Sequence, residues 1–307
     1  VCAFSLSSQS CTVNSNRGIY NHRFDKNIPK LDQLYAGKFT HVFHVVPFYD
    51  GDKDNVLTVY DNSYYFESYI AQAYQKIKNE GFTHFFFVAD DMILNPVINE
   101  NNLFEMTGIS DECSFIRDLR DIKSHPYVVP LFTPVEQKGI EVAKYLPTHE
   151  DACKAFEHNG LSCFPSKWYA VMDFFHRLGR KQLRTAIKAL QYIFGTVKSR
   201  SLPGVWAYSD VVLIPATYME KFALYCGAFG GLNIFVEQAI PLALILASEK
   251  IMLQKDVRLK VIPQLYTLGE EGQRQFEEKY AFSLQALLSD YPEDWFLCHP
   301  IKLSKWK

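Results

Sequence analysis

Two adjacent carboxylates, Asp90 and Asp91, stand in the segment THFFFVADDMILNP (residues 83–96), directly after a run of apolar residues. The apolar run predicts a buried strand, and two charges at its end are costly unless a cation or hydrogen-bond donors lie nearby. One interpretation is that the pair caps a helical turn, because Asp is a common N-cap residue. The other is that the pair binds a divalent cation, for which carboxylate oxygens are suitable ligands.

The segments around this pair predict where it lies. Residues 38–51 (KFTHVFHVVPFYDG) indicate a buried strand that ends in a turn, residues 62–81 have apolar side chains at helical spacing, and residues 83–90 indicate a second strand. A strand, a helix and a strand in this order form a βαβ unit with parallel strands. Ligands bind at the carboxyl ends of such strands. We therefore expect an α/β fold with a site at the edge where Asp90 and Asp91 lie.

The same segment resembles the DxD-type metal motif of GT-A glycosyltransferases, which bind nucleotide sugars, and the triplet here is Ala89-Asp90-Asp91. The resemblance implies a GT-A-like, Rossmann-type mixed sheet flanked by helices. It implies that Asp91 is a metal ligand and that Asp90 contacts a ribose or a metal-bound water. Ala89 stands where the family usually has an acid, which leaves the contacts of that acid open.

The end of the chain carries a second resemblance. HPIKLSKW (residues 299–306) is similar to the terminal H-x-x-G-x-x-K-P-W motif of the glycogenin-like and lipopolysaccharide galactosyltransferases of that fold. The resemblance implies that His299 completes the metal site and that Lys305 holds the diphosphate, with Lys302 as a second lysine within reach. Lys302 replaces the usual Gly, and no Pro precedes Trp306. Carboxylate oxygens and one imidazole suit Mn²⁺, and Mg²⁺ nearly as well.

The turn after the first strand is the expected place for the base of a nucleotide sugar, which we expect to be UDP-linked. Its candidate residues are Pro47, Phe48, Tyr49 and Asp50. Phe48 or Tyr49 would stack on the base, and Asp50 would accept a hydrogen bond. The alternative is an ordinary turn whose aromatic residues belong to the core.

The segment GAFGGLNIFVEQAIP (residues 227–241) indicates a glycine-rich loop followed by a helix. Gly230 and Gly231 would allow close approach of a ligand, and Glu237 would lie near the helix start, where the helix dipole stabilises a carboxylate. The resemblance to inverting GT-A enzymes implies that Glu237 is the general base for the acceptor hydroxyl. The retaining group instead has Asp-Gln-Asp in this region, which Glu237-Gln238 could echo. A capping or salt-bridged Glu237 is the structural alternative.

A strand is predicted over residues 204–215 (GVWAYSDVVLIP) and a later one over residues 257–266. Trp206, Tyr208 and Asp210 of the first are candidate substrate-binding residues, although a buried strand would also explain the aromatic pair.

Composition narrows the function classes. The chain has 307 residues, is 48% hydrophobic and carries a net charge of −2, which excludes nucleic-acid binding through bulk charge. Seven scattered cysteines without a C-x-x-C pair argue against a disulfide framework and a zinc site, and favour a reducing compartment. No apolar run of transmembrane length and no signal peptide is evident, so we expect a cytoplasmic protein. The first residue is Val1, which leaves open that the chain is part of a longer protein.

We expect one GT-A-like domain over residues 1–307, with a nucleotide-binding part (about 38–100), a helical acceptor-side insertion (about 101–203) and a catalytic and C-terminal part (about 204–307). Helices are predicted over residues 111–124 and 165–201. The second carries a basic stretch, residues 177–200, that could contact the inner face of a membrane. Its alternative is a solvated helix face.

These patterns favour a metal-dependent glycosyltransferase that transfers a sugar from a UDP-sugar to a hydroxyl of a glycan or glycolipid in surface polysaccharide synthesis, with inversion and Glu237 as base. Three alternatives stay open. They are a retaining enzyme of the same fold, a nucleotidyltransferase or phosphohydrolase, and a non-catalytic glycan-binding domain.

Overall fold

A computed structural model describes residues 2–3, 6–7, 12–13, 16–19, 25–121, 140–163, 166–179, 183–194, 202–262, 265 and 269–307. The central strand of the fold is β7 (His84–Ala89), in which all six residues are buried. Its aromatic and β-branched residues suit a strand that is covered on both faces.

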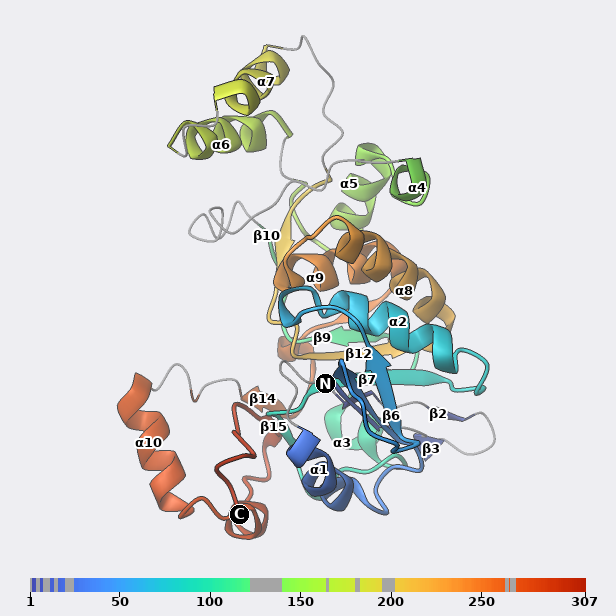
Figure 1. The fold of residues 1–307 in the computed structure, drawn as a ribbon, viewed down its shortest axis with the longest axis vertical. Coiled ribbons are helices and arrows are strands. Elements are labelled where there is room, and N and C mark those ends of the chain that lie inside the picture. Colours follow the sequence, from blue (N-terminus) through green and yellow to red (C-terminus); the bar gives the residue numbers. More distant parts are fainter. Residues whose placement is uncertain are drawn as a thin grey trace.

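The main sheet of the described residues has eight strands and is mixed (Figure 1). Its principal order is β6, β5, β4, β7, β12, β9, β13, and β1 pairs with β5 and β7. The first four strands of that order are parallel, β12 is antiparallel to both of its neighbours, and β13 is parallel to β9. The bounds are β1 Cys2–Ala3, β4 Asn16–Ile19, β5 Val42–Pro47, β6 Val56–Val59, β9 Ser114–Ile116, β12 Val211–Pro215 and β13 Ile251–Met252.

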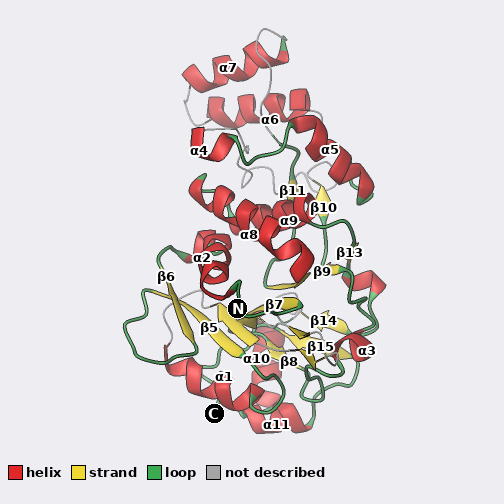
Figure 2. Cartoon of the chain, turned by 90° about the vertical axis from the view of Figure 1, so that its right-hand side faces the viewer, coloured by secondary structure: helices red, strands yellow, loops and turns green. Residues whose placement is uncertain are grey.

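Helices cover both faces of this sheet (Figures 1 and 2). One face carries α2 (Glu67–Ile77), α8 (Ala216–Gly231) and α9 (Val236–Ala247), and the other carries α1 (Ile28–Tyr35) and α3 (Leu103–Thr107). Every residue of α9 is buried except Glu237. An apolar helix that is buried all round belongs to the core, so its single accessible carboxyl is conspicuous.

Smaller elements extend the fold at both ends. One three-stranded sheet joins β14 (Lys260–Ile262), β15 (Trp295–Cys298) and β8 (Ile93–Leu94) beside the C-terminal helices. Two-stranded pairs join β10 (Arg120–Asp121) to β11 (Val205–Trp206), and β2 (Leu6–Ser7) to β3 (Thr12–Val13). The remaining helices are α4 Ile140–Ala143, α5 His149–His158, α6 Ser166–Gly179, α7 Leu183–Ile193, α10 Gly269–Lys279 and α11 Leu284–Ser289.

The first βαβ unit is confirmed: β5, α2 and β7 occur in this order, with the unpredicted strand β6 between β5 and α2, and β5 and β7 are parallel. Between them lies β4, a short strand with polar residues whose sequence gave no clear strand pattern. The mixed α/β architecture is therefore confirmed. The structure describes residues 101–121 as part of the main sheet and its surroundings, whereas the sequence placed them in a helical insertion.

Other predicted elements were wrong. Ser114–Ile116 is a strand and not part of a helix, because Phe115 and Ile116 pair with β12 in the core. The predicted helix over residues 165–201 is two helices, α6 and α7, packed on each other. The strand over residues 204–215 is split into β11 and β12. A disulfide joins Cys153 to Cys163, against the expectation of reduced cysteines.

Candidate functional site

The two segments that were predicted to share a metal ion, one around Asp91 and one around His299, lie side by side in the structure. Asp91 follows β7, and β8 directly after it pairs antiparallel with β15, with Ile93 opposite Cys298. This register places His299, the residue after β15, beside Asp91. The two side chains form an ion pair with 3.3 Å between His299 Nε2 and Asp91 Oδ1, and the Ile301 N–H donates to the Asp91 carbonyl at 2.6 Å.

Asp210 joins them because β12 runs antiparallel to β7. The residue before β12 therefore lies at the edge where β7 ends, and the Ala89 N–H donates to the Asp210 carbonyl at 2.8 Å. Burial opposes ionisation of Asp91, but His299 lowers the pKa of Asp91 on balance. Burial likewise opposes protonation of His299, and Asp91 and Asp210 raise its pKa. Burial raises the pKa of Asp210, and Asp91 adds to that effect.

Arg117 is a fourth charged residue at this edge, and the sequence did not single it out. It follows β9, whose Ile116 pairs with Val212 of β12, so it lies near Asp210. Burial lowers the pKa of Arg117 although Asp118 opposes that effect. Its Nη1 is buried and has no hydrogen-bond partner among the described residues. A buried guanidinium with unused donor capacity suits an anionic ligand.

Asp90 is buried, and the Asn27 side-chain amide donates to it at 3.4 Å. Asn27 precedes α1, so this acid is tied to the helix on the opposite face of the sheet from Glu237. Asp91, with a side chain 24% exposed, is the more accessible member of the pair.

A cavity of about 290 Å³ opens beside Asp210 and is lined in part by Glu237. Its walls come from the turn before α2, the loop before β12 and the start of α9. They are formed by Ser63, Tyr64, Phe66, Ser209, Asp210, Phe235, Val236 and Glu237. Mixed aromatic and carboxyl walls of this kind are typical of small-molecule sites.

Glu237 lies in the first turn of α9, as predicted. The Trp206 Nε1–H donates to Glu237 Oε2 at 2.6 Å. The backbones of the same two segments also meet, because the Ala207 N–H donates to the Glu237 carbonyl. Burial raises the pKa of Glu237 to about 7, with Asp210 adding to the effect and the Trp206 hydrogen bond opposing it. A carboxyl that titrates near neutrality beside a cavity is suited to general acid–base chemistry.

Aromatic rings and arginine side chains pack around Trp206, the residue that donates a hydrogen bond to the Glu237 carboxyl. The Trp206 and Tyr208 rings meet edge to face at 4.9 Å. Arg120 lies 4.8 Å from the Trp206 ring centre, and Arg117 lies 4.6 Å from that of Tyr208. Trp206 and Tyr208 thus act on the site through Glu237 and the arginines. Neither ring is among the residues that line the cavity, and direct contact of these rings with a substrate stays a prediction.

The predicted base-binding turn lies at the same edge. Ile19 of β4 pairs with Val45 of β5 and with Ala89 of β7, so Val45 and Ala89 stand at one level, two strand spacings or roughly 10 Å apart, and Pro47 ends β5 two residues later. Phe48 is 57% exposed, and its ring meets that of Tyr60 edge to face at 5.7 Å. Tyr49 packs partly against the core, and Asp50 is exposed. Phe48 is therefore the ring that is free to stack.

The two candidate lysines lie on the surface, whereas the two candidate glycines lie in a helix. Lys302 and Lys305 follow His299 in the chain and are exposed, while Ile301, Leu303 and Trp306 around them in the sequence are buried. Gly230 and Gly231 belong to the last turn of α8, which corrects the predicted loop. A Cβ at Gly230 would lie 2.8 Å from the Ser68 Cβ, so this glycine serves the close approach of α8 to α2 and not that of a ligand.

The Asp91 and His299 pair fits a divalent cation. Two ligands of one octahedral ion, each at about 2.1 Å, lie about 3 Å apart, close to the observed 3.3 Å. Asp210 does not complete a tight three-ligand cluster: the group of His149, Cys153 and Cys163 is the one found among the described residues with all ligand atoms within 4.8 Å. Ions such as Mg²⁺ commonly take one or two protein ligands and fill the remaining positions with phosphate oxygens and water.

The predicted basic stretch, residues 177–200, lies largely outside the described side chains. In the part of the chain that the structure describes, no helix has the length and apolar character that crossing a bilayer requires. Comparison of the chain with family models, with curated proteins and with solved structures gave no match.

Proposed function

We propose that this chain is a metal-dependent, inverting glycosyltransferase that transfers a sugar from a UDP-sugar to a hydroxyl of a glycan or glycolipid. The observation that carries the proposal is the meeting of Asp91 and His299 at 3.3 Å, beside a cavity that is lined in part by Glu237. These residues come from distant parts of the chain and were selected by motif alone. The mixed sheet accords with a GT-A-like fold, and both Asp91 and the predicted base-binding turn follow parallel strands of that sheet.

The donor would lie along this edge. Phe48 would stack on the uracil, and Asp90 would face the ribose. Asp91 and His299 would hold Mn²⁺ or Mg²⁺, which would act as a Lewis acid on the departing diphosphate. Arg117 would add a fixed positive charge to the same leaving group, as would Lys302 and Lys305, which are exposed and follow His299 in the chain.

Glu237 would act on the acceptor. Its carboxylate takes the proton of the acceptor hydroxyl while that oxygen attacks the anomeric carbon and the bond from this carbon to the phosphate oxygen breaks. Trp206 fixes the orientation of the carboxylate through its 2.6 Å hydrogen bond. Gln238, the neighbour that a retaining mechanism would call on, is 2% exposed and does not line the cavity. This difference in access favours inversion with one general base.

Calorimetric titration with UDP and then with several UDP-sugars, each with and without Mn²⁺, tests the proposal. We expect Mn²⁺-dependent binding of UDP by the wild-type chain and its loss in Asp91→Asn and His299→Ala. Nuclear magnetic resonance of the product should show an inverted anomeric centre. Nucleotide binding that is absent, or that is the same without metal, would refute the assignment. Hydrolysis of the nucleotide sugar at full rate without any acceptor would instead favour a phosphohydrolase.

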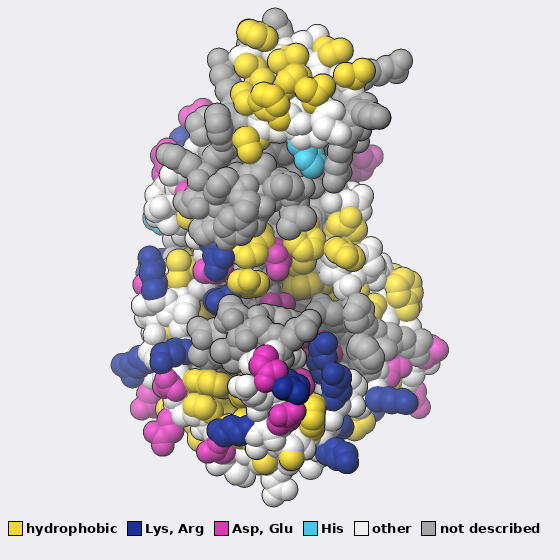
Figure 3. Space-filling view, turned by 90° about the vertical axis from the view of Figure 1, so that its left-hand side faces the viewer, with side chains coloured by type: hydrophobic (Ala, Val, Ile, Leu, Met, Phe, Trp, Pro, Cys, Tyr) yellow, Lys and Arg dark blue, Asp and Glu magenta, His cyan; other side chains and the backbone are white. Residues whose placement is uncertain are grey.

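The α6–α7 hairpin supports an acceptor at a membrane surface. It lies at one end of the molecule, where Figure 3 shows hydrophobic side chains gathered on the exposed face. The large exposed apolar residues on it are Phe175, Leu178, Leu183, Ile187 and Phe194. In the sequence of residues 166–194, six basic residues accompany one acidic residue, in a chain of net charge −2. Apolar side chains on a strongly basic helical pair match an anionic lipid bilayer.

We therefore include in the proposal that this hairpin binds the inner, anionic leaflet and brings the site to a glycolipid acceptor. Cosedimentation with vesicles of phosphatidylglycerol and phosphatidylcholine, compared with phosphatidylcholine alone, tests this part. We expect binding to the anionic vesicles and its loss in the double variant Phe175→Ser, Ile187→Ser. Val97→Ser, which removes an equally exposed apolar side chain from the body of the molecule, should bind like wild type. Equal binding by all three proteins would contradict the membrane assignment.

A further inference from the structure

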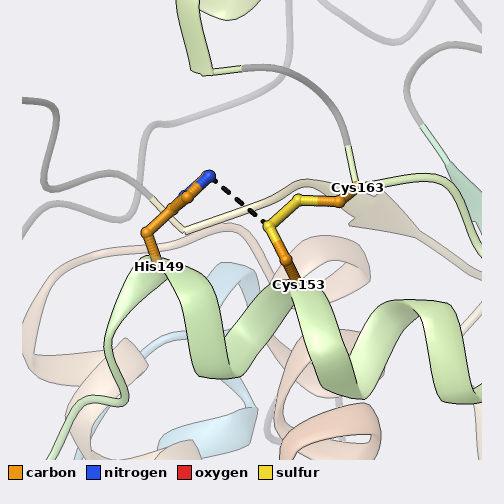
Figure 4. Close-up of side chains that lie close together, drawn as sticks. All are labelled: His149, Cys153 and Cys163. Carbon is orange, nitrogen blue, oxygen red and sulfur yellow. Dashed lines mark hydrogen bonds between the residues drawn. A yellow bond between two sulfur atoms is a disulfide. The ribbon is translucent and has the colours of Figure 1, made fainter.

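A second histidine cluster lies on α5, away from the sheet edge. His149 and Cys153 stand one turn apart on this helix, and Cys163 lies beside them from the segment that follows it (Figure 4). His149 Nε2 is 3.4 Å from Cys153 Sγ, and the two cysteine sulfurs are joined. All three side chains are half-buried. The disulfide joins the two sulfurs, and the spacing of one helical turn places the imidazole beside Cys153.

The backbone brings Cys163 back to the helix by a defined turn. Gly160 takes the left-handed conformation, with φ of +69°, and the Leu161 N–H donates to the Phe156 carbonyl at 2.9 Å. Such a reversal after a helix is a common glycine-dependent C-terminal motif. The Ser162 N–H donates to Asp121 at 3.4 Å, which ties the returning segment to β10. The backbone positions of the three residues are therefore set by contacts outside the cluster.

Two sulfurs and one imidazole nitrogen form a soft ligand set. Zn²⁺ binds thiolate sulfur at about 2.3 Å and imidazole nitrogen at about 2.0 Å, so in a tetrahedral site sulfur and nitrogen lie about 3.5 Å apart. The observed 3.4 Å between His149 Nε2 and Cys153 Sγ matches this separation. Partial exposure leaves access for the ion and for a water molecule in the fourth position. This chemistry differs from the oxygen-rich set that Mn²⁺ and Mg²⁺ prefer.

We propose that His149, Cys153 and Cys163 bind a soft divalent cation of the Zn²⁺ class when the two cysteines are reduced, and that the disulfide and the metal-bound forms exclude each other. Reduction by two molecules of a small thiol breaks the sulfur–sulfur bond and yields two cysteine thiols and one external disulfide. Binding of the ion then releases two protons as the thiols become thiolates. Either form ties α5 to Cys163, which precedes the α6–α7 hairpin.

The test uses the full chain reduced with a phosphine, stripped of metal and titrated with Co²⁺ and then Zn²⁺. We expect one equivalent of Co²⁺ to give the intense absorption of tetrahedral sulfur-to-cobalt coordination, and Zn²⁺ to abolish it. The oxidised chain should give none. Only thiolate ligands produce the sulfur-to-cobalt band, so the result is independent of any metal at Asp91 and His299 and of the proposed transferase activity.

Three variants locate the site. Cys163→Ser should lose the band, and His149→Gln, which keeps both thiols, should weaken Zn²⁺ binding by at least about 100-fold. Cys113→Ser removes a half-buried free cysteine elsewhere and should behave like wild type. The proposal is overturned if the reduced, folded wild-type chain gives no band, or if Cys113→Ser loses the band as fully as Cys163→Ser does.

Discussion

Glu237 and Glu67 are two carboxyls in similar local positions with different surroundings. Each lies in the first turn of a helix, α9 and α2 respectively, and burial raises the pKa of both, to about 7 for Glu237 and about 9 for Glu67. Glu237 faces a cavity and accepts a hydrogen bond from Trp206. Glu67 is completely buried, and neither of its carboxyl oxygens accepts a hydrogen bond from another described residue.

The contrast between these two surroundings shows that an elevated pKa alone does not indicate a catalytic role. Desolvation alone moves a carboxyl toward or past neutrality, so the shift by itself marks burial. A general base also needs access to the proton that it removes and a donor that orients it. Glu237 has both and Glu67 has neither. The sequence alone does not distinguish Glu237 from Glu67, because both glutamates stand near the start of an apolar helical segment.

Replacement of the two glutamates by glutamine should affect turnover in one case and not in the other. Glu237→Gln keeps the shape of the side chain but removes the proposed base, and we expect sugar transfer to fall by about 10²- to 10⁴-fold with the UDP affinity unchanged. Glu67→Gln should transfer sugar at the wild-type rate. Steady-state kinetics with a UDP-sugar and calorimetry with UDP measure both. Transfer that survives in Glu237→Gln would show that the base is another group.

The second contrast concerns stability against pH. Burial raises the folded-state pKa of Glu67 to about 9, well above the usual pKa of a glutamate, so the folded chain binds the proton more tightly than the unfolded chain does. Its contribution is fully present below the unfolded pKa and is lost as pH rises toward 9, at up to about 1.4 kcal/mol per pH unit. Glu67→Gln removes this titration. We expect the melting temperature of the variant, relative to wild type, to rise steadily between pH 5 and pH 8.

Glu237→Gln provides the matched measurement. Its folded-state pKa of about 7 lies closer to the unfolded value, so its relative gain in melting temperature should level off near neutral pH. If the melting temperatures of both variants differ from that of wild type by the same amount at every pH in this range, the two carboxyls do not differ in burial.

Sequence patterns predicted the parts of the fold that local periodicity determines. The apolar runs and Gly81 gave β5, α2 and β7, and the motif residues Asp91 and His299 proved to be neighbours. The strand β9 was missed because Phe115 and Leu119 have helical spacing, whereas the pairing of β9 with β12 and β13 decides its structure. Arg117 was missed for the same reason, since its place depends on a strand order that one sequence does not encode locally.

The glycine pair shows the same limit and yields a third prediction. Gly230 lies against Ser68, the residue after Glu67, so the close contact of α8 with α2 helps to bury that carboxyl. We expect Gly230→Ala to lower the free energy of unfolding by about 1–3 kcal/mol through overpacking. Gly231→Ala meets no atom within 4 Å and should leave stability unchanged or slightly higher. Urea denaturation compares them. Equal effects would mean that the helices are not in close contact at Gly230.

The smallest expected effect is a shift in the pH profile of transfer. Because the proposed mechanism uses the deprotonated form of Glu237 as the base, kcat/KM should rise with pH through about 7 and then level off. The Trp206 hydrogen bond lowers the pKa of Glu237, so Trp206→Phe, which removes the N–H donor and keeps an aromatic ring, should move the midpoint to higher pH. Tyr208→Phe keeps its ring against Trp206 and loses a hydroxyl that does not contact Glu237, so its midpoint should stay at the wild-type value. A midpoint that moves equally in both variants would assign the effect to the packing of the two rings and not to the hydrogen bond that distinguishes Glu237 from Glu67.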